Sequence, residues 1–362
     1  MNRLLSIIKK LVPQRLRGWL ARMRHEHVHY VVSNTQDDVA FCLLGNPDRL
    51  AHFARIYLRS ASEYRVRRGL HRKNWSALAL DQARRHGMVV ATDLELPAEL
   101  EPLRLRVPHL VAMNLDLRES EAAFLKKLSH SARSDVVKVT REGYQAEVET
   151  NPEWAFEFFA RYHEKALKQR YGAEAYVMPA QTMANLLARK ACEFVCITLD
   201  GQRLAAVMCD VRGANYRMGR LGWLDGNPDL VKKGVLAAVY WFAMRRAREL
   251  GKTTIMFGGT PGYFEDGVFA YKMKWGAVLS REDTTFGIKD MVLDPTHPQA
   301  RAMLARNSFI GVDADERFVV YSCKEPRDVR ITPEMQNCIA RWYQPDPAGK
   351  PFVFSAKPEW PQ

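Results

Sequence analysis

The segment spanning residues 257–276 constrains the fold of this chain more than any other. Just before it, residues 252–256 read Lys-Thr-Thr-Ile-Met, a β-branched run that predicts a strand. Glycine then recurs, and it ends the strand because it adopts backbone conformations that other residues avoid. These glycines stand at positions 258, 259, 262 and 267. Residues 268–275 predict a short helix that stops at Gly276.

The short helix carries the side chains that point most clearly to chemistry. Tyr271, Lys272 and Lys274 all lie on it, and the two lysines bring positive charge next to the glycine loop. A strand, a glycine break and a helix with a tyrosine and cations form a suitable place to hold an anionic or thioester substrate.

The ending Tyr271-Lys-Met-Lys-Trp275-Gly276 resembles the last helix of acyltransferase domains of the GNAT type. The likeness is closer to a branch that includes FemA/FemB-like aminoacyltransferases and the acetyltransferases found with bacterial polysaccharide genes, such as the cellulose-biosynthesis type. Upstream segments resemble the same branch in order and spacing. They are a Leu-Ser and basic-helix stretch within residues 124–143, Lys168-Gln-Arg170-Tyr-Gly172, and a run of strands around Asp200-Gly201. The resemblance covers about residues 107 to 290.

The resemblance implies an α/β (α+β) fold with a GNAT-like mixed central sheet flanked by helices. Relatives in this branch carry two such halves in tandem, so the chain is expected to contain one half or two. The expected divisions are a basic amphipathic helix, a degenerate N-terminal half, the acyltransferase domain and a C-terminal extension. They span residues 1–27, 28–108, 109–290 and 291–362, respectively.

Apolar periodicity, capping residues and turn residues predict the order of the elements. The expected helices span residues 46–70, 75–86, 120–128, 132–142, 152–169, 179–190, 231–250 and 298–306. The expected strands span residues 39–44, 88–91, 110–115, 144–149, 194–199, 203–211, 215–223, 252–257, 284–288 and 318–322. Asp200-Gly201 predicts a hairpin turn between two of these strands.

In GNAT enzymes the acyl carbonyl meets backbone N–H groups where two parallel strands splay apart. The resemblance places that point between the strands ending at Trp223 and Phe257, with a pyrophosphate-binding helix N-terminus at residues 227–236. This chain departs from the usual glycine-rich loop there, because Lys232, Lys233 and Gly234 replace it. These three residues are the expected donor-binding positions. The departure weakens the case for acetyl-coenzyme A and leaves acyl carrier protein and aminoacyl-tRNA open as co-substrates.

Three residues are the catalytic candidates. Tyr271 aligns with the GNAT tyrosine that protonates a leaving thiolate, and Lys272 aligns with a lysine that touches phosphate or the transfer centre. Asp266, in the glycine loop, is the third. The plainer alternatives are a buried helix aromatic for Tyr271 and a solvated lysine for Lys272. The expected substrate-binding residues are Arg133, Lys138, Arg170, Arg220, Tyr263, Lys274 and Trp275.

The sequence does not single out a general base. Glu265 shares the glycine loop with Asp266, and Asp210 and Asp225 lie at strand ends. His163 and Glu164 fall in the middle of an expected helix, where packing is the expected role. Substrate positioning can replace a dedicated base in transfer reactions.

Composition restricts the partners and the compartment. The formal charge of +13 favours anionic partners such as lipid surfaces, tRNA or phosphorylated small molecules. Six cysteines in 362 residues fit a reducing compartment, and the Cys-x3-Cys pair at 192 and 196 is expected to be core rather than a metal site. We predict a cytoplasmic protein with no metal and no tightly bound cofactor, either free or peripheral on the inner face of the cytoplasmic membrane.

Residues 1–26 alternate apolar and basic side chains with helical spacing. Such a helix lies on an anionic membrane or packs on its own domain with a solvated basic face. No window approaches the apolar length of a transmembrane helix.

Three functions compete on these observations. The first is acyl transfer to an amine or hydroxyl of an envelope sugar, glycolipid or polysaccharide precursor. The second is aminoacyl-tRNA-dependent transfer, which the positive charge favours. The third is a non-enzymatic membrane-surface or nucleic-acid binder. The sequence contains no P-loop, nucleophile elbow, zinc-protease motif or dinucleotide fingerprint, which excludes the corresponding common classes.

Overall fold

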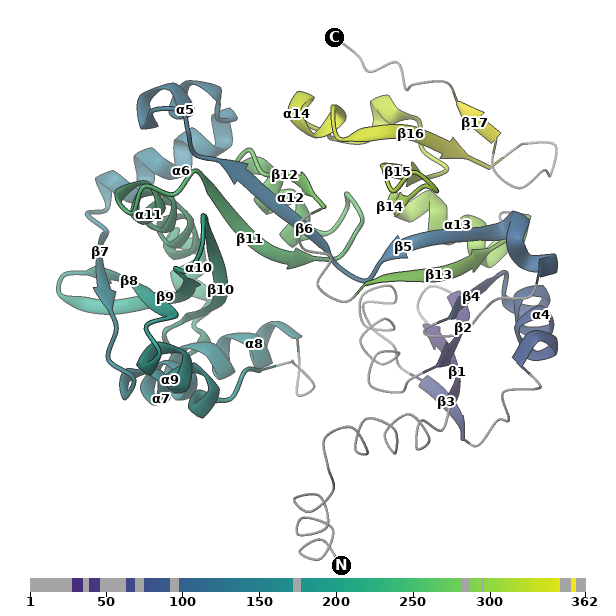
Figure 1. Ribbon diagram of the computed structural model, residues 1–362, viewed down its shortest axis with the longest axis horizontal. Helices are drawn as coiled ribbons and strands as arrows, with labels where there is room; N and C mark the ends of the chain where they lie inside the picture. The colour runs from purple at the N-terminus through teal and green to yellow at the C-terminus, as the bar shows by residue number, and fades with distance from the viewer. Residues whose placement is uncertain are drawn as a thin grey trace, which may run out of the picture.

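The computed structural model describes residues 28–34, 39–45, 63–68, 75–91, 98–171, 177–281, 287–294, 296–345 and 353–355. The expected helix at residues 1–26 lies outside them. Figure 1 shows a large sheet with its helices on one side of the molecule and two further sheets on the other. No helix among the described residues is both long and apolar enough to cross a bilayer.

The large sheet has seven strands, and one neighbouring pair in it is parallel. β10 (Asn215–Trp223) and β11 (Thr254–Thr260) form that pair, whereas all other neighbours are antiparallel. The spatial order is β12 (Val278–Ser280), β6 (Val111–Asp116), β11, β10, β9 (Gln202–Asp210), β8 (Cys192–Leu199) and β7 (Gln145–Glu149).

Helices cover both faces of this sheet, and the alternation of side chains along β8 shows how. Val195 and Ile197 point into a cluster built with one set of helices, whereas Phe194 and Cys196 point into a cluster built with another. The first set is α5 (Glu121–Lys127), α6 (His130–Arg141) and α11 (Val235–Glu249). The second is α7 (Trp154–Glu157), η3 (Phe158–His163) and α9 (Ala180–Ala188).

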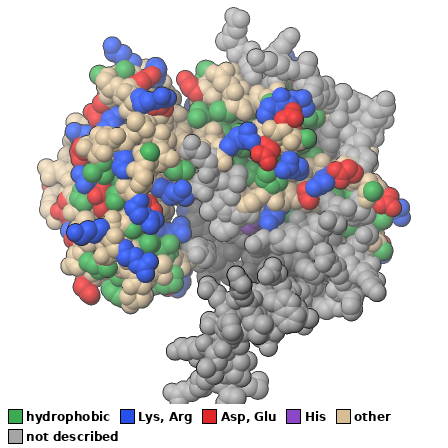
Figure 2. All heavy atoms as spheres, in the orientation of Figure 1, with side chains coloured by type: hydrophobic (Ala, Val, Ile, Leu, Met, Phe, Trp, Pro, Cys, Tyr) green, Lys and Arg blue, Asp and Glu red, His purple; other side chains and the backbone are tan. Residues whose placement is uncertain are grey.

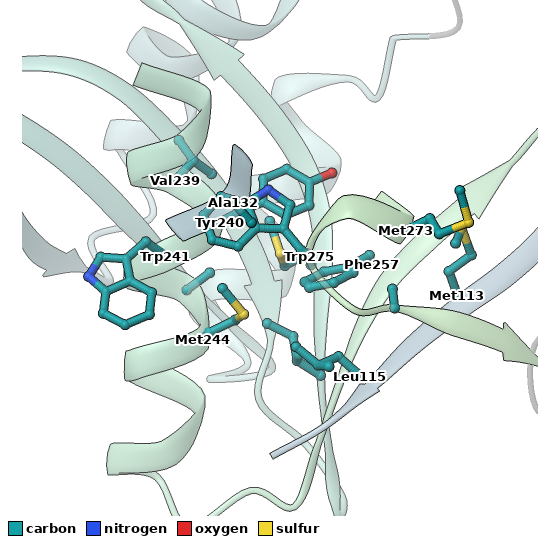
Figure 3. Packing of buried hydrophobic residues seen from close by; sticks show 14 of the residues in the cluster. Met113, Leu115, Ala132, Val239, Tyr240, Trp241, Met244, Phe257, Met273 and Trp275 are labelled. Carbon is teal, nitrogen blue, oxygen red and sulfur yellow. The ribbon is translucent and has the colours of Figure 1, made fainter. Parts of the chain in front are cut away.

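Aromatic rings form the centre of the first cluster. Figure 3 shows Tyr240 from α11, Phe257 from β11 and Trp275 from the end of α12 (Gly267–Lys274) meeting there. The Tyr240 and Trp275 rings stack with centroids 6.2 Å apart, and the Tyr240 and Phe257 centroids lie 5.0 Å apart. This packing fixes α12 against α11 and β11.

The remaining strands form two smaller sheets. The six-stranded sheet has the order β3 (Glu63–Arg68), β1 (Val28–Asn34), β2 (Val39–Gly45), β4 (Met88–Ala91), β13 (Ile288–Leu293) and β5 (Arg104–Pro108). The four-stranded sheet has the order β14 (Phe309–Val312), β15 (Phe318–Tyr321), β16 (Ile339–Gln344) and β17 (Val353–Ser355). α4 (Trp75–His86) packs on β2 and β4 of the first of these sheets, and α13 (Pro298–Arg306) lies between the two sheets in sequence.

The structure confirms the fold class, a mixed α/β arrangement with helices flanking a central mixed sheet. A second mixed sheet is compatible with two halves. The division into domains stays a prediction, although the boundary expected at residue 290 falls inside β13, which pairs with β4 and β5. The Asp200-Gly201 hairpin is confirmed, with both residues at positive φ.

Three element predictions were wrong in part. Residues 63–68, expected at the end of a helix, form β3, because Tyr64 and Val66 alternate with charged residues in the strand period. The helix expected over 152–169 is interrupted by the π-helical η3. The helix expected over 231–250 is divided into α10 (Pro228–Lys232) and α11 at Gly234, whose φ of 98° a helix cannot contain.

Candidate functional site

The parallel strands β10 and β11 separate after a short paired stretch. Asn215, Tyr216 and Arg217 pair with Thr254, Ile255 and Met256, and the ladder stops there although both strands continue. Each strand also carries an irregularity just beyond, between Met218 and Arg220 on β10 and between Met256 and Gly259 on β11. The two strands that the resemblance expected to splay apart are therefore parallel neighbours that pair over three residues each and are unpaired with each other beyond them.

A cleft of about 910 Å³ opens at this divergence. Its walls come from β10, β11, α6, α10, α11, α12, η3 and α8 (Glu164–Tyr171). β10 contributes Gly219, Leu221 and Trp223 to the wall, and β11 contributes Phe257 and Gly259. The cleft therefore brings together segments that are widely separated in sequence.

Cations dominate the charge of the cleft wall. Its lysines and arginines are Lys138, Arg170, Arg220, Lys232, Lys272 and Lys274, whereas Asp135 is the acidic side chain among the lining residues. Lys274 Nζ lies 2.5 Å from Asp135 Oδ2, and Lys232 Nζ lies 2.9 Å from Asp229 Oδ1. The remaining positive charge suits an anionic ligand. Figure 2 shows Lys and Arg side chains along the inner edge of the part that holds the large sheet.

The N-terminus of α11 reaches the cleft. Gly234, Leu236 and Ala237 line it, and Gly234 turns the chain out of α10. Lys138 approaches from α6, where its Nζ donates a hydrogen bond of 2.8 Å to the carbonyl of Lys232. A helix N-terminus with nearby lysines favours an anion because its first N–H groups lack helical partners.

Tyr271 lies on α12 with its ring held by other aromatics. Its ring centroid is 5.1 Å from that of Tyr240 in an edge-to-face contact, and Lys274 Nζ lies 5.6 Å from the Tyr271 ring centroid. Burial raises the pKa of the Tyr271 hydroxyl above its usual value, and the charge of Asp135 acts in the same direction. Tyr271 therefore keeps its proton at neutral pH and can donate it.

Lys272 is buried, so the alternative of a solvated lysine is wrong. Its side chain is 3% exposed, and its Nζ donates to the carbonyls of Gly258 at 2.9 Å and Gly259 at 3.1 Å. Burial lowers the pKa of the Lys272 ammonium to about 7, while the charge of Asp266 acts in the opposite direction. Lys272 thus ties α12 to the irregular part of β11.

Several predicted site residues lie off the cleft wall. Asp266 is the N-cap of α12, where its Oδ1 accepts from the backbone N–H groups of Val268 and Phe269, both at 2.9 Å. The described residues that line the cleft do not include Arg133, Tyr263, Trp275 or Lys233.

These four have other surroundings. Trp275 is fully buried in the first cluster, and Tyr263 is 3% exposed in the cluster that contains Phe309. Arg133 donates to the carbonyl of Lys126 at 3.4 Å, and the carbonyl of Lys233 accepts from the Tyr144 hydroxyl at 3.4 Å. Lys138, Arg170, Arg220, Lys232, Gly234, Tyr271, Lys272 and Lys274 are the predicted residues that the cleft brings together.

The other base candidates from the sequence are held by partners. Glu265 accepts from Ser308 and from Lys324 Nζ, at 2.8 and 2.6 Å. Asp210 pairs with Arg212, Asp225 with Lys165, and Glu164 with Lys168. None of these carboxylates lines the cleft.

His163 is the lining residue that the sequence assigned to packing. It ends η3 and is 1% exposed. Gly222 of β10 lies opposite it, where a Cβ would be 2.7 Å from the backbone nitrogen of His163. Only the fold brings that glycine opposite the histidine.

A second cavity of about 560 Å³ lies on the other side of α12 and shares Gly267, Tyr271 and Lys274 with the cleft. Residues of the C-terminal part, including Lys324, Arg330 and Thr332, form its far wall. Two cavities therefore meet at Tyr271.

No sequence family and no curated protein matches this chain. Solved structures that match this chain include FemX, at 14% identity and a TM-score of 0.40 over 74% of this chain and 89% of that one. L-PGS from Bacillus licheniformis is 13% identical with a TM-score of 0.36, over 77% of this chain and 84% of that one. A GCN5-related N-acetyltransferase from Kribbella flavida is 10% identical with a TM-score of 0.28, over 79% and 59%. Similarity this distant carries no conclusion about activity or substrate.

Proposed function

We propose that this protein transfers an acyl group from a carrier bound in the cleft to an amine or hydroxyl of an acceptor. One observation supports this above others. The backbone of two diverging parallel strands, the N-terminus of α11 and a protonated Tyr271 all border one cationic cleft. Together they supply donors for a carbonyl oxygen, a place for a phosphate and a proton for a leaving group.

The reaction follows from these roles. The acceptor nitrogen or oxygen attacks the acyl carbonyl, and backbone N–H groups at the divergence stabilise the oxyanion. The bond from carbon to the carrier sulfur or oxygen then breaks, and the leaving atom takes a proton from the Tyr271 hydroxyl. The acceptor loses one proton in the same turnover, so Tyr271 is reprotonated and the proton count balances.

Three kinds of acyl carrier suit the charge of the cleft. A cationic wall accepts acyl-coenzyme A, acyl carrier protein or aminoacyl-tRNA, which all carry phosphate. Lys232 ends α10 just before Gly234, where the resemblance expects a glycine-rich loop for coenzyme A, and this departure supports aminoacyl-tRNA as the second candidate. We place the acceptor among envelope sugars, glycolipids or polysaccharide precursors, on the resemblance and on the basic character of residues 1–26.

The test is a screen of the purified protein for thermal stabilisation and for acyl transfer by mass spectrometry. The donors are acyl-coenzyme A species, acyl carrier protein and aminoacyl-tRNA. Stabilisation and transfer with a thioester donor supports the first candidate, and salt-sensitive tRNA binding with transfer supports the second. Binding without transfer to any acceptor would leave a non-enzymatic binder and contradict the proposal.

Tyr271→Phe gives the sharpest check on the mechanism. Removing the phenolic proton is expected to lower kcat about 10²-fold, because general-acid catalysis contributes at least that much. The aromatic packing stays, so the melting temperature should hardly change. Tyr343→Phe is the control, because that ring stacks on Tyr321 outside the cleft. Equal activity of both variants would remove Tyr271 from the reaction.

We also propose that residues 1–26 bind anionic membranes from the cytoplasmic side. Flotation with vesicles of phosphatidylglycerol and phosphatidylcholine tests this, with pure phosphatidylcholine as the control. Deleting residues 1–26 should abolish binding to the anionic vesicles while the melting temperature is retained. Unfolding of the truncated protein would instead support packing of this segment on its own domain.

A further inference from the structure

His163 occupies an unusual position in its helix. It is the last residue of η3, a π-helical segment between α7 and α8, and π-helical turns occur frequently at functional sites. The Phe158 ring stacks on the imidazole with centroids 5.6 Å apart and planes inclined by 16°. Backbone of β10 passes directly beside it at Gly222, where any side chain would collide with Tyr162 and His163. Phe158 therefore packs on the imidazole, and β10 packs on the backbone that carries it.

Hydrogen bonding determines which ring nitrogen carries the proton. Nδ1 of His163 lies 2.9 Å from the carbonyl oxygen of Leu221 on β10. A carbonyl oxygen only accepts, so Nδ1 must donate, and in a neutral ring Nε2 is then left with a lone pair. Nε2 is buried and has no hydrogen-bond partner among the residues that the structure describes. A buried acceptor without a partner is costly, and a ligand proton would satisfy it.

The charges around η3 favour the neutral ring. Burial lowers the pKa of His163 below its ordinary value, and the nearby positive charge of Arg220 on β10 acts in the same direction, against the hydrogen bond to Leu221. Most of the other charged groups on elements packed against η3 are engaged elsewhere. They are Glu157 with Arg161, Glu164 with Lys168, Lys165 with Asp225, Arg203 with Glu149 and Asp210 with Arg212. Arg170 on α8 and Arg217 on β10 add positive charge on these elements, which also favours the neutral ring.

His163 lies in the cleft proposed to bind the acyl carrier. It lines the same cavity as Tyr271 and Arg220, at the side formed by β10 and α8. Tyr271 and Lys272 come from α12 on the side formed by β11. A base on one wall and an acid on the other is an arrangement that assists acyl transfer, with the carbonyl between them.

We propose that Nε2 of His163 is the general base that accepts the proton of the attacking amine or hydroxyl. This inference rests on the proposed acyl transfer and adds the acceptor's side to it. The acceptor forms its bond to the acyl carbon as its proton passes to Nε2, and the carrier leaves with the proton of Tyr271. Solvent then carries a proton from the imidazolium to Tyr271, so that both groups return to their starting state.

The variant that isolates the base is His163→Asn. The Asn amide nitrogen can still donate to the Leu221 carbonyl near the Nδ1 position, but the variant has no basic nitrogen. His130→Asn is the matched control, because His130 is exposed at the start of α6. We expect His163→Asn to lower kcat about 10²-fold or more. Stabilisation by acetyl-coenzyme A should change less than twofold in apparent affinity, and His130→Asn should match the wild type.

A pH profile separates a base from a structural residue. Wild-type kcat should fall as the pH drops through the pKa of His163, because the protonated ring cannot accept a proton. The His163→Asn variant should lose this acidic limb. ¹⁵N NMR of the wild-type protein should show at pH 7 a neutral ring protonated at Nδ1 and bare at Nε2, a readout independent of turnover.

Failure of the base role and failure of the proposed acyl transfer give different results. Unchanged kcat and an unchanged acidic limb in His163→Asn, or a ring protonated at Nε2 at pH 7, would overturn the base role and leave the proposed transfer intact. Absence of transfer by the wild-type protein with acyl-coenzyme A, acyl carrier protein and aminoacyl-tRNA would remove the proposed function and the base role with it.

Discussion

The two walls of the cleft each bury a titratable group, and the groups differ in how their nitrogens are satisfied. On the α12 wall, Lys272 donates to two glycine carbonyls of β11 at 2.9 and 3.1 Å. On the η3 wall, His163 donates from Nδ1 to Leu221 and its Nε2 has no partner among the described residues. Both have a lowered pKa because of burial.

This comparison shows that burial and a shifted pKa do not by themselves identify a reacting group. The Lys272 ammonium holds the irregular part of β11 in place, which is a structural task. The free nitrogen of His163 has no structural task. A group with a perturbed pKa is a better candidate for chemistry when one of its polar atoms is left without a partner.

The largest expected effect comes from Gly222→Ala, which breaks the η3 wall. A Cβ at this position would lie 2.6 Å from the carbonyl carbon of Tyr162 and 2.8 Å from the Cα of His163. Backbone cannot move aside as a flexible side chain can, so β10 and η3 must separate. We expect a loss of about 3 kcal/mol in the free energy of unfolding, at the upper end for overpacking. Urea denaturation measures it.

Gly267→Ala is the control for the glycine substitution. Gly267 has no atom within 4 Å of an added Cβ and no positive φ, so this change should leave stability within about 0.5 kcal/mol. A Gly222→Ala protein as stable as the Gly267→Ala protein would show that η3 does not need close contact with β10. The fixed position of His163 would then lose its support.

Lys272→Met tests the structural role of the buried lysine on the α12 wall. The thioether fills much of the lysine volume but leaves two glycine carbonyls without their donor. We expect a loss of about 2 kcal/mol near pH 9, where most of the Lys272 side chain is neutral and still donates. Circular dichroism during urea unfolding measures the difference. Lys126→Met, at an exposed position on α5, is the control.

The pH dependence of the same variant tests the direction of the shift. The folded-state pKa of Lys272 is about 7, below its unfolded value of 10.5, so between these values the unfolded chain binds more protons. The free energy of unfolding should therefore rise with pH across this window, with a slope on the order of 1 kcal/mol per pH unit from this group. Lys272→Met should lack that contribution. Parallel wild-type and Lys272→Met curves between pH 7.5 and 9.5 would contradict the assigned shift.

The sequence predicted the elements of the large sheet well, because its strands and helices are marked by local patterns. The hairpin at Asp200-Gly201 follows directly from its turn residues, and β8 (Cys192–Leu199) follows from a run that contains Val195, Ile197 and Thr198. It failed where the deciding contacts are distant in sequence. β3 exists because β1 offers it an edge. β13 (Ile288–Leu293), which shares only its first residue with the expected strand at 284–288, forms because β4 and β5 flank it.

The same division holds for the candidate site. A local motif singled out Tyr271, Lys272 and Lys232, and all three line the cleft. The tautomer of His163 depends on Leu221, and that pairing joins segments 58 residues apart. Asp266 shows the converse, since a carboxylate in a glycine loop reads the same in the sequence whether it caps a helix or takes part in catalysis, and the structure shows the cap.

Asp266 gives the smallest and most discriminating test, because it separates capping from catalysis on the α12 wall. Its Oδ1 accepts from Val268 and Phe269 and lies 3.3 Å from the Thr260 hydroxyl. Asp266→Ala should cost about 1 kcal/mol of stability, whereas Asp266→Asn should cost far less because asparagine caps helices as well as aspartate does. If Asp266 were the base, Asp266→Asn would lose kcat while keeping its stability. We expect it to keep both, and steady-state kinetics of Asp266→Asn beside His163→Asn then decides which wall of the cleft takes the acceptor proton.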